Sequence, residues 1–229
     1  MRVVSLDRPS ALASAVEQLE LRPPLPTLVV VGGADRIGRT ALDRLRAFVY
    51  DLIGIAERVG AAVVDGGTDT GVMQLLGEAR ARRRSVPLIG VVVASLTAEP
   101  GTKPAGRQSA LEPNHSHMLL VPGKEWGDEV PWLAGLASTL AGDAPSVTVL
   151  LDGGEIAYAD ASASVSAGRP VLAIVGSGRT ADALAAAVRG ESSEESGRAL
   201  AASGLVRALD LRKDSIEVIE QTLSGETGK

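Results

Sequence analysis

The chain lacks the residues on which several common kinds of site depend. Its 229 residues include no cysteine, which excludes a disulfide framework and a thiolate metal site. Only 2% of the residues are aromatic, so we expect an aliphatic core. No apolar run reaches the roughly 18 residues of a membrane span, and the N-terminus has no secretory apolar segment. The sequence therefore predicts a soluble, cytoplasmic protein.

What the chain does contain is enough for one globular domain. Hydrophobic residues make up 45% and charged residues 22% of the sequence, which suffices for a real core. The formal net charge is −5, and this acidic balance argues against a dedicated nucleic-acid-binding protein.

Short apolar runs alternate with amphipathic segments along most of the chain. Continuous apolar runs closed by glycine or turn residues are typical of strands buried on both faces, and helices between them favour a parallel sheet. Strands are predicted at 27–33, 61–67, 87–94, 117–123, 146–154, 170–178 and 204–211, and helices at about 38–59, 70–84, 129–141, 155–168, 178–189 and 213–223. The fold class is therefore α/β, with one doubly wound, mainly parallel sheet in a single domain over 27–229.

Three segments depart from this alternation. Residues 1–26 contain a short helical pattern and a proline-rich connector, and we expect them to form an N-terminal extension. The polar loop 95–116 contains three prolines, and we expect it to border the ligand cleft and to be more mobile than the sheet. The acidic stretch 190–197 is expected to be a surface connection or the start of a helix.

Four predicted strands end in glycine-rich sequences: "VVGGADRIG", "VVDGGTDTG", "LLDGGE" and "IVGSGRTAD". Free backbone N–H groups at the start of the following helices favour anions, and ligands bind beyond the carboxyl ends of parallel strands. Thr68, Thr70 and Ser177 add hydroxyl groups, and Arg179 lies in a first helical turn. None of the four sequences matches the phosphate loop of classical nucleotide hydrolases or the dinucleotide-binding glycine pattern.

The only two histidines, His115 and His117, lie in "LEPNHSHMLLV". On one strand they would face the same side and form a candidate metal pair. Without a cysteine or a third histidine, we instead expect their imidazoles to be hydrogen-bonded to backbone where the loop meets the strand, with no metal site.

Taken together, these motifs resemble a known family. "VVGGADRI", "DGGTDTGVMQLLGEA", "LIGVV", "LEPNHSHMLLV", "WGDEV", "LLDGGE" and "GSGRTAD" occur in the order seen in the SLOG domain, over about residues 27–190. Within it, the chain resembles the prokaryotic version of the N-terminal domain of melastatin-type TRP channels. The resemblance implies a Rossmann-like fold that senses nucleotide-derived ligands such as ADP-ribose or cyclic ADP-ribose.

The resemblance also implies which residues bind the ligand, with no cofactor required. The implied ligand-binding residues are Gly32, Gly33, Ala34, Gly66, Gly67, Thr68, Gly71, Val72, Met73, Gly153, Gly154, Glu155, Gly176, Ser177, Gly178 and Arg179. Two positions depart from the channel pattern. Asp65 stands where the channels often have a hydroxyl, and residues 130–137 lack an arginine that the channels carry.

The same superfamily contains the LOG-type phosphoribohydrolases, which cleave the base from a nucleoside monophosphate. In their signature, "PGGxGTxxE", a glutamate stabilises an oxocarbenium-like state at the ribose. In "LDGGEIAYADA" the threonine and the glutamate are replaced, and we expect neither Glu155 nor Asp160 to act in its place. We therefore favour binding over catalysis, with no catalytic residue. SLOG modules often accompany membrane effectors, so a separately encoded effector is an alternative partner, and a homo-oligomer stays open.

Overall fold

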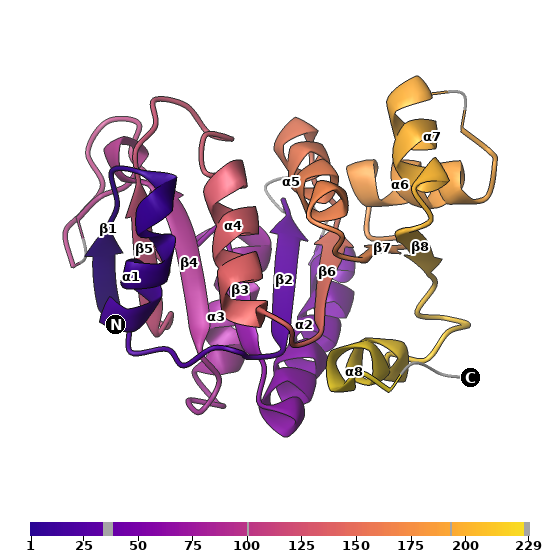
Figure 1. The fold of residues 1–229 in the computed structure, drawn as a ribbon. Coiled ribbons are helices and arrows are strands. Elements are labelled where there is room, and N and C mark those ends of the chain that lie inside the picture. Colours follow the sequence, from indigo (N-terminus) through magenta and orange to yellow (C-terminus); the bar gives the residue numbers. More distant parts are fainter. Residues whose placement is uncertain (34–38, 100, 193, 227–229) are drawn as a thin grey trace.

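The computed structural model describes residues 1–33, 39–99, 101–192 and 194–226. These residues form one sheet of eight parallel strands in the order β1-β5-β4-β3-β2-β6-β7-β8, with helices on both faces (Figure 1). The strands are β1 (Arg2–Ser5), β2 (Thr27–Gly32), β3 (Ala62–Asp65), β4 (Leu88–Val93), β5 (His117–Val121), β6 (Ser146–Leu151), β7 (Val171–Ile174) and β8 (Val206–Leu209). The predicted Rossmann-like α/β fold is confirmed.

Two layers of helices sandwich the sheet because its central strands are apolar on both sides. Val29 and Val31 of β2 face one core, and Leu28 and Val30 face the other. The first core is covered by α1 (Leu12–Gln18), α4 (Val130–Ala141), α5 (Glu155–Ser166), α6 (Arg179–Val188) and α7 (Glu195–Ala202). The second is covered by α2 (Arg39–Val59), α3 (Gly71–Arg80) and α8 (Glu217–Ser224).

Residues 1–26, which we expected as an extension, contribute to this same sheet and core. β1 pairs with β5 through four residues, and Leu12, Ala15 and Val16 of α1 are buried in the first core. The acidic stretch 190–197 leads into α7. None of the helices in the described part of the chain has both the length and the apolar character that a membrane span requires.

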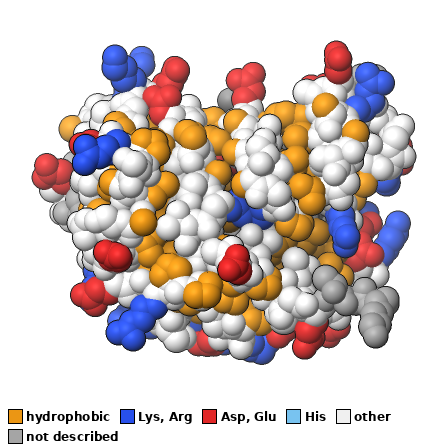
Figure 2. Space-filling view, viewed as in Figure 1, with side chains coloured by type: hydrophobic (Ala, Val, Ile, Leu, Met, Phe, Trp, Pro, Cys, Tyr) orange, Lys and Arg blue, Asp and Glu red, His pale blue; other side chains and the backbone are white. Residues whose placement is uncertain are grey.

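The order of the strands creates one point at which neighbouring connections diverge. From β2 the chain moves outward through β3, β4 and β5, and it then returns to place β6 on the other side of β2. The loops after β2 and β6 therefore leave the sheet toward opposite faces, which opens a crevice at the carboxyl edge. On the face shown in Figure 2, charged side chains stand mostly around the margins, and hydrophobic and uncharged groups make up most of the middle, where one basic and one acidic group are visible.

Candidate functional site

A cleft of about 540 Å³ lies at this divergence point. The ends of β2, β3 and β6 and the first turns of α3, α5 and α6 form its walls, as expected for a ligand site in an open parallel sheet. The lining residues are Val30, Val31, Gly32, Gly33, Gly66, Thr68, Thr70, Met73, Ser109, Trp126, Glu129, Leu133, Gly154, Glu155, Ile156, Ala157, Asp160 and Arg179.

The cleft brings together one part of the residue set that the sequence predicts. Gly32, Gly33, Gly66, Thr68, Met73, Gly154, Glu155 and Arg179 line it. Gly67, Gly71, Val72, Gly153, Gly176, Ser177 and Gly178 are not among its lining residues. Val72 is fully buried in the second core, and the Ser177 hydroxyl donates to the carbonyl of Ile174 at 2.6 Å. Ala34 lies outside the described residues.

The glycine pair after β3 shows why part of a glycine motif does not reach the cleft. Gly67 has a φ of 64°, and a side chain there would place Cβ 2.8 Å from the Cα of Gly90 in the neighbouring strand β4. Its N–H donates to Oδ1 of Asp65 at 2.8 Å. Gly67 therefore lets its loop pack closely against the sheet, while Gly66 lies at the cleft surface.

Most amides in the loop after Gly67 already have partners inside the protein. Asp69 N–H donates to the carbonyl of Ala110 at 2.9 Å, and Thr70 N–H donates to that of Thr68 at 2.8 Å. Ser109, in the loop 95–116, lies at the cleft, so this loop borders the cleft as expected. For an anion, the loop offers the Thr68 and Thr70 hydroxyls, 3.1 Å apart, and the first-turn amides of α3.

Arg179 stands at the start of α6 and reaches across the cleft floor to the end of β6. Its Nε and Nη2 donate to the two carboxylate oxygens of Asp152 at 2.9 and 2.6 Å. The arginine side chain is 43% exposed, whereas the Asp152 side chain is 4% exposed. A bidentate pair of this kind fixes the plane of the guanidinium, and Arg179 also lines the cleft.

Gly33 leaves space for this guanidinium, whereas a side chain at Gly154 would make only an ordinary contact with it. A Cβ at Gly33 would stand 2.8 Å from Nη2 of Arg179, and one at Gly154 would stand 3.8 Å from Nη1. The loops after β2 and β6 thus approach the arginine with backbone alone. The arginine is placed where three of the predicted glycine-rich loops meet.

Large apolar side chains also line the cleft, as do the carboxyl-bearing side chains of Glu129, Glu155 and Asp160. Trp126, on the loop after β5, is 36% exposed, and Ile156 at the start of α5 is 38% exposed. Leu133 and Met73 also line the cleft. Large apolar side chains left exposed at a cleft are typical of a surface that binds a flat or apolar group. Trp126 begins the motif "WGDEV", but the ligand-binding residues implied by the resemblance did not include it.

Comparison with known proteins identifies the family. Residues 25–220 match the family described as SLOG in TRPM, prokaryote. The chain belongs to this family. It is 28% identical over 222 residues to the transient receptor potential cation channel subfamily M member 2 of Mus musculus, covering 80% of this chain and 15% of the channel. It is 32% identical over 202 residues to the member-like 2 protein of Nematostella vectensis, covering 70% of this chain and 13% of that protein.

The fold of this SLOG domain also occurs in a protein solved by structural genomics, TM1055. The two structures align with a TM-score of 0.57 at 19% identity, over 85% of this chain and 98% of that chain. This similarity supports the Rossmann-like fold and says nothing about the ligand.

Two buried carboxyl groups line the SLOG cleft, and one of them, Asp160, was not expected to act. Burial, followed by the nearby charge of Glu129, raises the pKa of Asp160 to about 7. Burial also raises the pKa of Glu129, whose Oε2 accepts from the Gly127 N–H at 2.8 Å. When Asp152 is aligned with the proline of "PGGxGTxxE", Asp160 falls on the position of the glutamate. Asp160 is thus a shorter carboxylate at the signature position.

A second buried network lies beneath the SLOG domain's glycine loop. His115 Nε2 lies 2.8 Å from Oδ1 of Asp65, and its Nδ1 lies 2.8 Å from Oε2 of Glu112. All three side chains are at most 2% exposed. We expected the His115 imidazole to bond backbone, but it bonds two carboxylates, and His115 lies just before β5. The imidazole of His117, the first residue of β5, bonds the Ser116 hydroxyl. In the described ranges, no group of three or more histidine, aspartate or glutamate side chains has an arrangement that could hold a metal ion.

Proposed function

We propose that the cleft binds a phosphorylated, nucleotide-derived ligand such as ADP-ribose or cyclic ADP-ribose, and that the domain acts as a sensor module. The observation that carries this proposal is that one cleft is lined by both polar and large apolar side chains. Thr68, Thr70 and Arg179 offer hydroxyls and a guanidinium, and Trp126 and Ile156 offer exposed apolar surface. A nucleotide likewise combines a charged phosphate with a flat, largely apolar base.

The part of the cleft formed by Thr68, Thr70 and Arg179 suits a phosphate group because of its positive charge. The first turns of α3 and α6 and the Arg179 guanidinium contribute positive charge to one region, and Asp152 offsets part of it. The side chains of Glu129, Glu155 and Asp160 also line the cleft, so the ligand phosphate is expected near Arg179 and away from these carboxyl groups. The guanidinium fork, already oriented by Asp152, matches two phosphate oxygens. A ligand that occupies the cytoplasmic domain in this way would signal through a separately encoded membrane effector.

Arg179→Ala is expected to weaken the binding of ADP-ribose by roughly ten- to a hundredfold, because charge-assisted hydrogen bonds contribute about 1.5–3 kcal/mol each. The change also leaves the Asp152 carboxylate facing the cleft without its partner. Asp152→Asn removes a negative charge but also one of the two acceptors that orient the guanidinium, so it should weaken binding by less than Arg179→Ala does. Isothermal titration calorimetry measures both affinities.

Arg189→Ala is the matched control for these variants. Arg189 caps the far end of α6, where it pairs with Glu191 at the surface, so its loss changes the net charge equally. We expect its affinity to equal that of the unmodified protein. If Arg179→Ala and Arg189→Ala bind equally well, Arg179 has no part in the site. Adenosine and ribose 5-phosphate, titrated separately, show whether the phosphate or the base supplies most of the affinity.

A second candidate function is hydrolysis of a nucleotide N-glycosidic bond, and Asp160 is the observation that favours it. A carboxyl group with a pKa of about 7 is half protonated at neutral pH, which suits a general acid. In such a reaction AMP and water give adenine and ribose 5-phosphate. Because the protein is proposed mainly as a sensor, we expect incubation with AMP to release no adenine by chromatography. Release of adenine that Asp160→Asn abolishes would establish the enzyme instead.

A further inference from the structure

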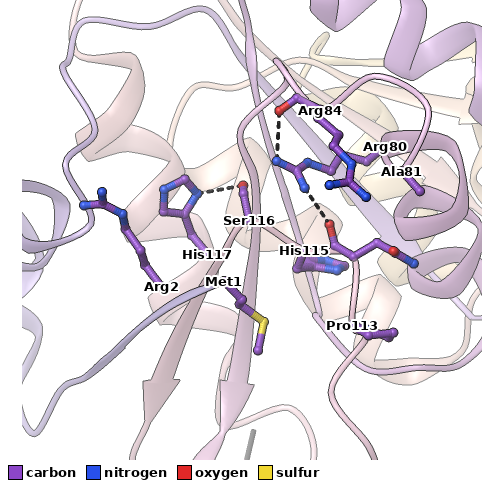
Figure 3. A pocket seen from close by; sticks show the side chains of 10 residues that line it. Met1, Arg2, Arg80, Ala81, Arg84, Pro113, His115, Ser116 and His117 are labelled. Carbon is purple, nitrogen blue, oxygen red and sulfur yellow. Dashed lines mark hydrogen bonds between the residues drawn. The ribbon is translucent and has the colours of Figure 1, made fainter. Parts of the chain in front are cut away.

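A second pocket, of about 420 Å³, lies at the amino edge of the sheet, away from the carboxyl-edge cleft. It lies between the start of β1, the end of α3 and the start of β5 (Figure 3). Its lining residues are Met1, Arg2, Arg80, Ala81, Arg84, Pro113, Asn114, His115, Ser116 and His117. Three arginines and no aspartate or glutamate are among them, in a chain whose net charge is −5.

The three arginines differ in how they are held. Arg80 is fixed by the backbone, because its guanidinium donates to the carbonyls of Val86, Asn114 and Arg84 at 2.9–3.2 Å. Arg2 forms an ion pair with the exposed Glu20. The structure gives the exposed Arg84 guanidinium no hydrogen bond or ion pair to any residue that it describes. The pocket thus contains a fixed cation, Arg80, and an adaptable one, Arg84.

These cations also affect the pKa of the nearby His117 imidazole. Burial, followed by the charges of Arg2, Arg80 and the N-terminal ammonium, lowers the pKa of His117 to about 4, although a hydrogen bond to the backbone of Leu19 opposes this shift. Burial and the neighbouring Arg84 likewise lower the pKa of Arg80. Positive groups that disfavour one another's charge gain from an anion placed among them.

We propose that this amino-edge pocket binds the phosphate group of a small molecule, with Arg84 as the mobile clamp and Arg80 as the fixed charge. A guanidinium fork offers two parallel donors to phosphate oxygens, and the pocket volume leaves room for a small group attached to the phosphate. This site is separate from the carboxyl-edge cleft and does not depend on its proposed ligand.

His117 gives a local measurement of occupancy because the chain has only two histidines. Inorganic phosphate and ribose 5-phosphate are titrated at pH 7, and the imidazole signals are followed by NMR and assigned with His117→Gln. We expect a saturable shift of the His117 signal. Arg84→Ala should weaken this binding about tenfold, whereas Arg179→Ala should leave it unchanged. Tighter binding of ribose 5-phosphate identifies a phosphate ester as the ligand, and tighter binding of inorganic phosphate identifies the free ion.

Arg82→Ala is the matched control, because Arg82 lies two residues from Arg84 and stacks on Tyr50 outside the pocket. It should bind phosphate within twofold of the unmodified protein. A shift that does not saturate, or an equal loss in Arg82→Ala and Arg84→Ala, would show only diffuse charge screening and overturn the proposal. Because Arg84 bonds Arg80 only through its own carbonyl, Arg84→Ala keeps that contact and the fold.

Discussion

Gly77→Ala is expected to destabilise the protein by about 3 kcal/mol or more, although the same change inside a helix normally stabilises it by up to about 1 kcal/mol. Gly77 is buried in α3, and a Cβ there would stand 1.9 Å from the carboxyl carbon of Glu112 and 2.0–2.2 Å from its oxygens. The carboxylate cannot move away freely, because it bonds His115 and the amide and side chain of Asn114. The methyl group would displace a buried charge from its partners.

Gly54→Ala is the matched control for this prediction. Gly54 is also buried inside a helix, α2, but a Cβ there would meet only the ends of Arg83 and Arg58 at 3.5–3.6 Å. We expect it to be neutral or to stabilise by about 0.5–1 kcal/mol. Urea unfolding, followed by circular dichroism, measures both variants. Equal stabilities for Gly77→Ala and Gly54→Ala would contradict the close approach of Glu112 to α3.

The unfolding free energy should decrease by roughly 3 kcal/mol as the pH rises from about 6.5 to above 9, because of His115. Burial alone would lower the pKa of His115, but the charges and hydrogen bonds of Asp65 and Glu112 raise it to about 9 from its ordinary 6.5. In this window the native state holds a proton that the unfolded state has released. The stabilisation is thus complete below pH 6.5 and is lost as the pH rises through about 9.

His115→Gln keeps a hydrogen-bonding side chain but removes the charge, so it should abolish this pH dependence and lower stability at pH 6. His117→Gln is the control, since the pKa of His117 is lowered to about 4 and lies outside the window. The dependence should survive in that variant. Urea unfolding at half-unit steps of pH gives the slope for each protein. A slope between pH 6.5 and 9 that persists in His115→Gln would show that His115 is not the group responsible.

The position of the cleft could be predicted from sequence because parallel strands bring their carboxyl ends to one edge. Once the runs at 27–33, 61–67 and 146–154 are assigned as parallel strands, the glycines at their ends must lie at the same edge of the sheet. Which glycines reach the cleft could not be predicted in this way. Gly67 packs against Gly90, a residue of another strand, and only the register of β3 against β4 brings them together.

The ion-pair partners of the charged residues could not be predicted from the sequence either, because the two members of each pair lie far apart in the chain. Asp152 and Arg179 are 27 residues apart, and Asp65 and His115 are 50 residues apart. Periodicity reports which face of an element is apolar, but it contains no information on such pairs. β1 escaped prediction because four residues, only one of them buried, give too little pattern to distinguish a strand from a connector.

The most direct measurement of the central claim is a crystal structure of the protein grown with ADP-ribose. We expect the nucleotide in the carboxyl-edge cleft, with a phosphate bonded to Arg179 and the hydroxyls of Thr68 or Thr70, and with the base against Trp126. An empty cleft at a saturating concentration of ADP-ribose, or a nucleotide bound there with its phosphates turned away from Arg179, would contradict the account.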